Sequence, residues 1–174
     1  LPAPSVPFPV NWPPSLGAVA ALPTGRDSNQ PWAEFAGSAS GGGVSQSPAQ
    51  AIEPSITAGT AGQFVAWADS RMGMYQIYVA EHTGSGWQEL ADSAHDRGIS
   101  AAATSARRPS ITLDASDQPI VAYTVLDGSS TDIFVTRYDP TANAGLGSWV
   151  ALGSSLSAGG ISGTGAADAR GAGV

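Results

Sequence analysis

One short segment of the sequence combines histidine and carboxylate residues at a spacing that could bind a metal ion. His95 lies in the sequence D-S-A-H-D, between Asp92 and Asp96. Imidazole nitrogens and carboxylate oxygens are common ligands of divalent cations such as zinc. The segment is also a linker rich in Gly, Ser and Ala, where the same residues are typical of solvated turns. These three residues are therefore the metal candidates of the sequence, but we expect neither a metal nor a cofactor.

The other charged residues are better explained by turns than by catalysis. Asp114 and Asp117 lie in L-D-A-S-D-Q-P, where an aspartate that caps backbone amides is favoured over calcium ligation. Asp69 and Arg71 lie between two apolar runs and are interpreted as solvated turn residues. Paired catalytic carboxylates, the G-x-S-x-G motif, phosphate-binding loops and dinucleotide fingerprints are absent from the sequence. The sequence therefore predicts no catalytic residue.

Large aromatic residues recur at equivalent positions and could offer a stacking surface for sugars. Trp67 and Tyr123 form one such set, and the second set consists of Trp32, Trp87 and Trp149. A single binding site does not need one aromatic residue in every repeat. We therefore interpret both sets as packing residues between repeats, with carbohydrate binding as the alternative.

These aromatic residues mark an internal repeat, which decides the fold class. Each tryptophan of the second set lies 22 residues before an equivalent position. The pairs are Trp32 and Pro54, Trp87 and Pro109, and Trp149 and Gly171. Between them, a glycine, a Val or Ile and a serine recur in register. The sequence P-S-I-T begins at Pro54 and again at Pro109, so each proline opens a repeat unit.

Each repeat unit contains four short apolar runs that predict β-strands. The runs are P-S-I-T, V-A-W or V-A-Y, I-Y-V or I-F-V, and the run that the tryptophan opens. They are rich in Val, Ile and aromatic residues and are bounded by Gly, Ser, Asp or Asn, as strands are. Short links between them predict an antiparallel meander. The longer Gly- and Ser-rich segment then connects the outer edge of one sheet to the inner edge of the next.

This organisation predicts an all-β chain, a β-propeller of four-stranded antiparallel blades. Two blades are complete, at 54–108 and 109–170. Residues 32–53 provide an orphan outer strand that closes the ring and a connection to the next blade, and 171–174 start a further blade. Propellers need about four to eight blades. We therefore expect the ring to be completed by further chain, in preference to assembly from several copies.

The blade sequence P-S-I, V-A-W, I-Y-V and tryptophan resembles that of exported bacterial β-propeller repeat proteins. The resemblance covers roughly residues 32–174 and rests on the repeat motif. It implies four-stranded blades around a central axis, used as a binding or scaffolding surface outside the cell.

Composition and charge limit the remaining function classes. The 174 residues include 14 acidic and seven basic residues, for a net charge of −7, and no cysteine. This excludes a disulfide scaffold, a cysteine zinc site and a basic nucleic-acid surface. No apolar run reaches the roughly 18 residues of a membrane span. Eight of the 13 prolines lie in residues 1–31, which predicts an extended N-terminal arm.

The sequence therefore predicts a non-enzymatic, exported propeller that binds or scaffolds proteins, such as a subunit of an extracytoplasmic complex. Its partner is another protein or the other blades of the same propeller, and not nucleic acid. The alternative is a fragment of a propeller-fold hydrolase of the sialidase or glycosidase type. A carbohydrate-binding propeller with its site in other blades is a further alternative.

Overall fold

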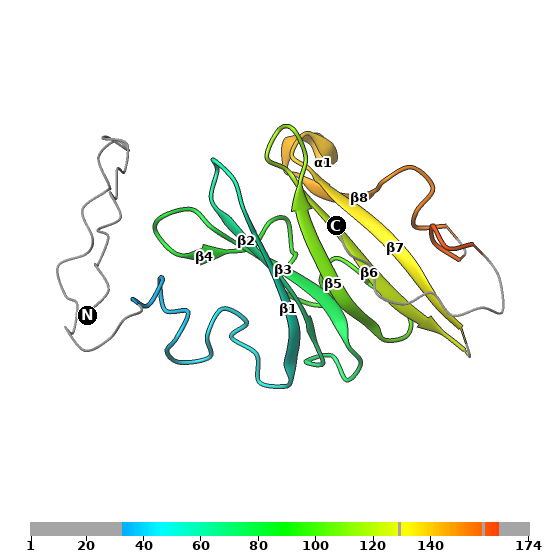
Figure 1. Cartoon of the computed structure of the whole chain (residues 1–174), viewed down its shortest axis with the longest axis horizontal. Coiled ribbons are helices and arrows are strands. Elements are labelled where there is room, and N and C mark those ends of the chain that lie inside the picture. The colour runs from blue at the N-terminus through cyan, green and yellow to red at the C-terminus, as the bar shows by residue number, and fades with distance from the viewer. Residues whose placement is uncertain (1–32, 129, 158, 164–174) are drawn as a thin grey trace, which may run out of the picture. The chain divides into compact units, whose positions relative to one another are not determined.

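Residues 33–128, 130–157 and 159–163 are described by the computed structural model of the chain (Figure 1). They form two four-stranded antiparallel sheets, and α1 (Ala142–Gly145) is a four-residue turn in which Asn143 and Ala144 have left-handed backbone angles. The predicted arm at 1–31, Trp32 and the predicted start of a further blade at 171–174 lie outside these residues. Within the described part of the chain, no helix has the length and apolar character needed to cross a bilayer.

The two sheets have the same topology. The first sheet has the order β1 (Ala51–Ala58), β2 (Gln63–Asp69), β3 (Gln76–His82) and β4 (Trp87–Gln88). The second sheet has the order β5 (Ala106–Leu113), β6 (Pro119–Asp127), β7 (Ser130–Asp139) and β8 (Ser148–Ala151). Every pair of neighbouring strands is antiparallel. The all-β class and the four-stranded antiparallel sheets expected from the sequence are therefore confirmed.

The repeated prolines lie inside the first strand of each sheet, so the strands begin three residues before the predicted starts of the repeat units. Glu53 and Pro54 together oppose one residue of β2, and Arg108 and Pro109 oppose one residue of β6. Glu53 and Arg108 both have a φ of 55°. Proline has no N–H and disfavours the right-handed helical conformation in the residue before it. A bulge accommodates both restrictions and lets the strand continue.

The segments that follow β4 and β8 are more than connections between sheets. The N–H of Ile99 donates to the carbonyl of Ile77 at 2.8 Å, and the N–H of Ile161 donates to that of Ile133 at 2.8 Å. These segments therefore run back along β3 and β7 and cover the outer edge of each sheet. Sequence reasoning missed this role because the segments consist of turns and lack the alternation of a strand. Residues 33–36, expected in an orphan outer strand, belong to neither sheet.

The glycine of each Gly-Ile-Ser sequence allows this close approach. Gly98 and Gly160 have φ values of 56° and 57°. A Cβ built at either glycine would lie within 3.0 Å of the carbonyl oxygen of Ile77 or Ile133. The repeat therefore needs glycine for two reasons, the left-handed backbone and the space next to the strand.

A shared apolar core lies between the two sheets. Tyr123 is 1% exposed within it. The other buried members come from both sheets and from the segment after β4: Phe64, Ala66, Ala68, Ile77, Val79, Ile99, Ala106, Ile111 and Val121. A second cluster of Trp67, Tyr78 and Ala80 lies on the other face of the first sheet and packs against Val44. The first sheet is thus covered on one face by the second sheet and in part on the other face by the segment around Val44.

We expect Gly98→Ala to destabilise the protein by more than about 2 kcal/mol, because the new Cβ meets both a strained backbone and a strand carbonyl. Gly41→Ala is the matched control, since Gly41 also has a φ of 56° but no atom within 4 Å of its Cβ position. Urea unfolding of both variants measures the difference. Equal losses in the two variants would contradict the close approach described here.

Candidate functional site

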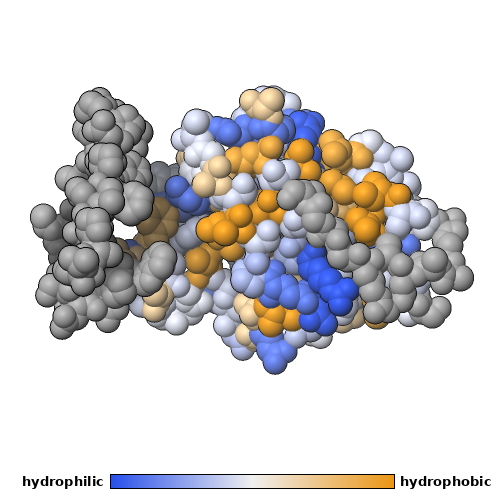
Figure 2. Space-filling view, viewed as in Figure 1, coloured by the Kyte–Doolittle hydropathy of each residue, from blue (hydrophilic) through white to orange (hydrophobic). Residues whose placement is uncertain are grey.

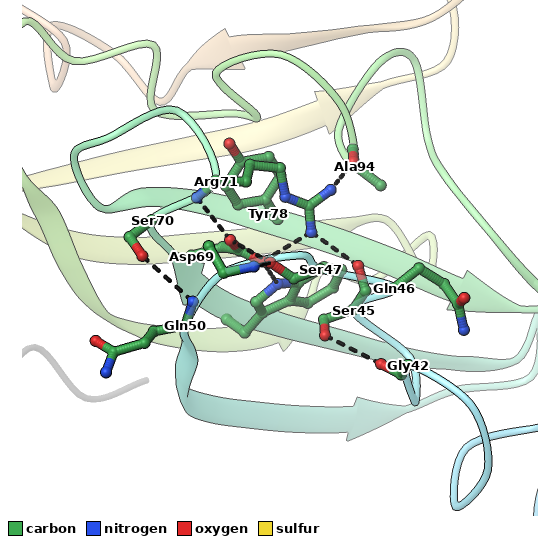
Figure 3. A network of polar contacts seen from close by, with 12 residues as sticks. Gly42, Ser45, Gln46, Ser47, Gln50, Asp69, Ser70, Arg71, Tyr78 and Ala94 are labelled. Carbon is green, nitrogen blue, oxygen red and sulfur yellow. Dashed lines mark hydrogen bonds and ion pairs between the residues drawn. The ribbon is translucent and has the colours of Figure 1, made fainter.

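The most elaborate polar site in the described residues is a buried network at the end of β2 (Figure 3). Asp69, at the last position of this strand, is completely buried. Its carboxylate accepts hydrogen bonds from the indole Nε1 of Trp67 at 3.2 Å and from the hydroxyl of Ser47 at 2.8 Å. It also accepts from the backbone N–H of Arg71 at 2.9 Å and from the guanidinium at 2.7 Å. Four donors therefore surround this carboxylate.

Arg71 joins three parts of the chain through its guanidinium. In addition to Asp69, it donates to the carbonyl of Ser45 and to the carbonyl of Ala94, both at 2.8 Å. The guanidinium carbon lies 4.4 Å from the centroid of the Tyr78 ring, within the range of a cation–π interaction. Arg71 thus connects the turns around residue 45 and residue 94 across the face of the first sheet.

The interpretation of Asp69 and Arg71 as solvated turn residues is wrong. The strand sequence F-V-A-W-A-D places Asp69 on the same face as Trp67, two residues earlier, because strand side chains alternate. This face is buried, and the acid is therefore buried with its arginine. The alternation was the available signal, but it does not reveal which segment covers the face.

Burial alone would raise the pKa of Asp69, but the hydrogen bonds from Arg71, Ser47 and Trp67 outweigh it and lower the pKa below its ordinary value. The carboxylate is therefore ionised at neutral pH. Its two oxygens are occupied by donors, so it is a poor general base. We therefore interpret the network as structural, without a role in proton transfer.

The metal candidates are brought together only in part. Glu89, Asp92 and His95 each offer a ligand atom, and these atoms lie within 4.8 Å of one another. His95 Nδ1 contacts a carboxylate oxygen of Glu89. Asp96 is outside this group, and its backbone carbonyl accepts a hydrogen bond from the Tyr78 hydroxyl at 2.6 Å. Sequence reasoning missed Glu89 although it lies three residues before Asp92, the same spacing that separates Asp92 from His95, because only the D-S-A-H-D segment was considered.

A cavity of about 460 Å³ contains the groups of this region. Its walls include Gln46, Arg71, Trp87, Glu89 and His95. The Arg71 guanidinium is hydrogen-bonded to Asp69 and to two backbone carbonyls, and Glu89 contacts His95. Among the described lining residues, none is an activated nucleophile or a pair of free carboxylates. The cavity can bind a polar group but has no evident catalytic machinery.

Trp67 and Tyr123, the repeated aromatic residues of β2 and β6, have no ring face open to a sugar. Trp67 packs against Tyr78 with 6.0 Å between the ring centroids, and Tyr123 packs against Phe134 at 6.1 Å. Trp67 and Tyr123 are 3% and 1% exposed. A stacking platform for carbohydrate would need at least one of these faces in solvent.

The aspartates of the β5–β6 turn serve two purposes. Asp114 accepts hydrogen bonds from the backbone N–H groups of Ser116 and Gln118, at 2.8 and 3.0 Å, so it caps its own turn. Asp117 instead accepts from the backbone N–H of Thr60 at 3.0 Å and from the Thr60 hydroxyl. Asp117 therefore links this turn to the corresponding turn of the first sheet.

Comparison with known proteins adds little to this geometry. No family model matches the chain, and no curated protein matches it. Among solved structures, the chain is similar to a glycosyl hydrolase from Bacteroides ovatus at 13% sequence identity and a TM-score of 0.39. The match covers 60% of this chain and 31% of that chain, so this chain spans about a third of the hydrolase. A likeness at this level carries no argument about function.

We expect Arg71→Ala to lower the free energy of unfolding by about 3 kcal/mol, because it leaves the Asp69 carboxylate buried without its cation. Arg107→Ala is the control, since Arg107 pairs with Glu53 at 2.9 Å but its side chain is 46% exposed. Exposed pairs contribute less than about 1 kcal/mol. Denaturant unfolding distinguishes the two, and a small effect of Arg71→Ala would contradict a structural network.

Folding lowers the pKa of Asp69 below its ordinary value of 3.8. The ionised carboxylate therefore stabilises the fold at pH above that value, and this stabilisation is lost as the pH falls below it. We expect Asp69→Asn to be much less stable than the native protein at neutral pH and to approach it in acid. Unfolding free energies measured from about pH 7 down to about pH 3 test this. Parallel stability curves for the two proteins would count against it.

Proposed function

We propose that the two sheets are successive blades of a β-propeller from an exported protein, and that the chain is a non-enzymatic module that binds or scaffolds other proteins. One observation carries this proposal. Equivalent residues of successive repeats make the same contact with the repeat before them. The indole Nε1 of Trp87 donates to the carbonyl of Phe35 at 3.2 Å, and that of Trp149 donates to the carbonyl of Leu90 at 2.9 Å.

These contacts support an arrangement in which each repeat is related to the one before it by the same rotation. Phe35 and Leu90 each stand three residues after the preceding repeat tryptophan in the sequence. At the other side of the sheets, the N–H of Ile111 donates to the hydroxyl of Ser55 at 3.3 Å, so β1 and β5 lie next to each other. Successive repeats are therefore in contact through equivalent residues near both edges of the sheets. Blades that follow one another around an axis have this arrangement.

The two sheets form a pair, and the faces that point away from the core between them are here called the end faces. Residues on the end faces are more exposed than their equivalents between the sheets. Ile111 is 5% exposed, whereas Ile56, its equivalent in the first sheet, is 68% exposed. Ile99 is 8% exposed, whereas Ile161, its equivalent after β8, is 61% exposed. The same residue type is buried where a neighbouring repeat covers it and exposed where the described residues include no such repeat. Each end face is therefore built to be covered by a further blade or by a protein partner.

A binding role is favoured over catalysis by the polar groups. The buried Asp69 pairs with Arg71, and the carboxylates of the turns accept backbone or hydroxyl hydrogen bonds. The surface in Figure 2 alternates between apolar and hydrophilic patches, a mixture common at protein interfaces. The net charge of −7 favours basic partners over nucleic acid.

We expect the 174-residue chain to associate in solution through its end faces, because exposed apolar faces favour contact with other apolar surface. Ile56→Glu should shift the protein toward the monomer, as measured by sedimentation velocity over a wide concentration range. Leu146→Glu is the control, since Leu146 is 76% exposed and lies outside both clusters. A monomeric native chain, or equal effects of the two variants, would overturn the proposal.

A further inference from the structure

A second cavity lies on the face of the second sheet, at the position that corresponds to the Arg71 network in the first. Its volume is about 490 Å³. Tyr123, Val125, Asp132 and Phe134 form its floor, and Leu156 belongs to the segment after β8 that borders it. Ser100 and its neighbours, from the segment after β4, form the opposite border.

The repeat places around this cavity the counterparts of the aromatic ring and of the two carbonyls that contact the Arg71 guanidinium. Phe134 is equivalent to Tyr78, whose ring stacks on Arg71 in the first sheet. The two carbonyls that accept hydrogen bonds from Arg71 belong to Ser45 and Ala94. Their equivalents in the repeat are Ser100 and Leu156, which both line the second cavity.

The carboxylate of this environment is also present, but on the neighbouring strand. Asp69 pairs across the strands with Gln76, and the equivalent pair in the second sheet is Val125 with Asp132. Asp132 thus stands at the position of Gln76, opposite the position of Asp69, and it lines the cavity. Asp132 is 5% exposed, and the hydroxyl of Ser162 donates to it at 3.2 Å.

The arginine itself has no counterpart in the second repeat. The residue equivalent to Arg71 is Asp127, because the β2–β3 and β6–β7 segments have the same length. An acid at this position cannot replace a guanidinium. The second cavity therefore has the acceptors and the aromatic wall for a cation, and no basic residue is among the described residues that line it.

We propose that this cavity binds the guanidinium of an arginine side chain that a protein partner presents. The planar cation stacks on Phe134, donates to the carbonyls of Ser100 and Leu156, and pairs with the carboxylate of Asp132. A lysine ammonium has no planar face to stack and no fork of donors for two separated carbonyls. The net charge of −7 draws such a basic partner to the surface.

This inference deepens the proposed binding role and rests on it, but a small probe tests the cavity separately from the end faces. N-acetyl-arginine methylamide, titrated into the full chain and followed by amide NMR, should shift the signals of residues around Phe134 and Leu156. The corresponding lysine and citrulline derivatives should bind at least about tenfold more weakly, because the first lacks the planar fork and the second lacks the charge. Equal binding of the three probes, or no shift at these residues, overturns the proposal.

Two variants locate the site. Asp132→Asn should weaken binding of the arginine probe about tenfold, since it removes the charge and keeps the shape. Glu89→Gln, in the cavity that Arg71 already occupies, is the matched control and should leave the affinity unchanged. The double variant Val125→Asp with Asp127→Arg rebuilds the native pair of the first sheet and should abolish probe binding. Unchanged affinity in Asp132→Asn contradicts the site even if the double variant fails to fold, whereas end-face association is unaffected by any of these results.

Discussion

A four-stranded sheet of this size cannot bury its apolar faces alone, and this constraint governs the rest of the structure. The first sheet meets it on one side with the second sheet and on the other with the turns around Val44, which the Asp69–Arg71 pair holds in place. Buried ion pairs often contribute little net stability. Here the value of the pair is positional, because one guanidinium fixes two irregular segments that have no ladder of their own.

Serine hydroxyls replace strand pairing along the outer edges. The hydroxyls of Ser93 and Ser155 donate to the carbonyls of Val79 and Val135, and Ser100 accepts from the N–H of Ile77. Backbone groups of the third strands are thereby satisfied without a full fourth strand. A short side chain that both donates and accepts suits this task, which explains why serine recurs in the repeat.

The fold was more predictable from the sequence than the candidate site was. Four apolar runs per repeat identified the strands and their order because alternation and turn residues are local signals. The buried pair of Asp69 and Arg71 was missed, since its burial depends on a segment more than 20 residues away. The metal candidates were found in part: Glu89 lies within six residues of His95 and joins Asp92 and His95 in the structure, whereas Asp96 does not. The sequence shows that equivalent residues recur in each repeat, but it does not show which of them contact the neighbouring repeat.

The covered outer edges have a consequence for how this chain can meet other chains. An exposed strand edge can pair with the same edge of another molecule and extend a sheet without limit. Turns along β3 and β7 occupy the donors and acceptors that such growth would require. Contacts through these sheets are thereby directed to the flat surfaces and away from the rims, which favours finite complexes over fibrils.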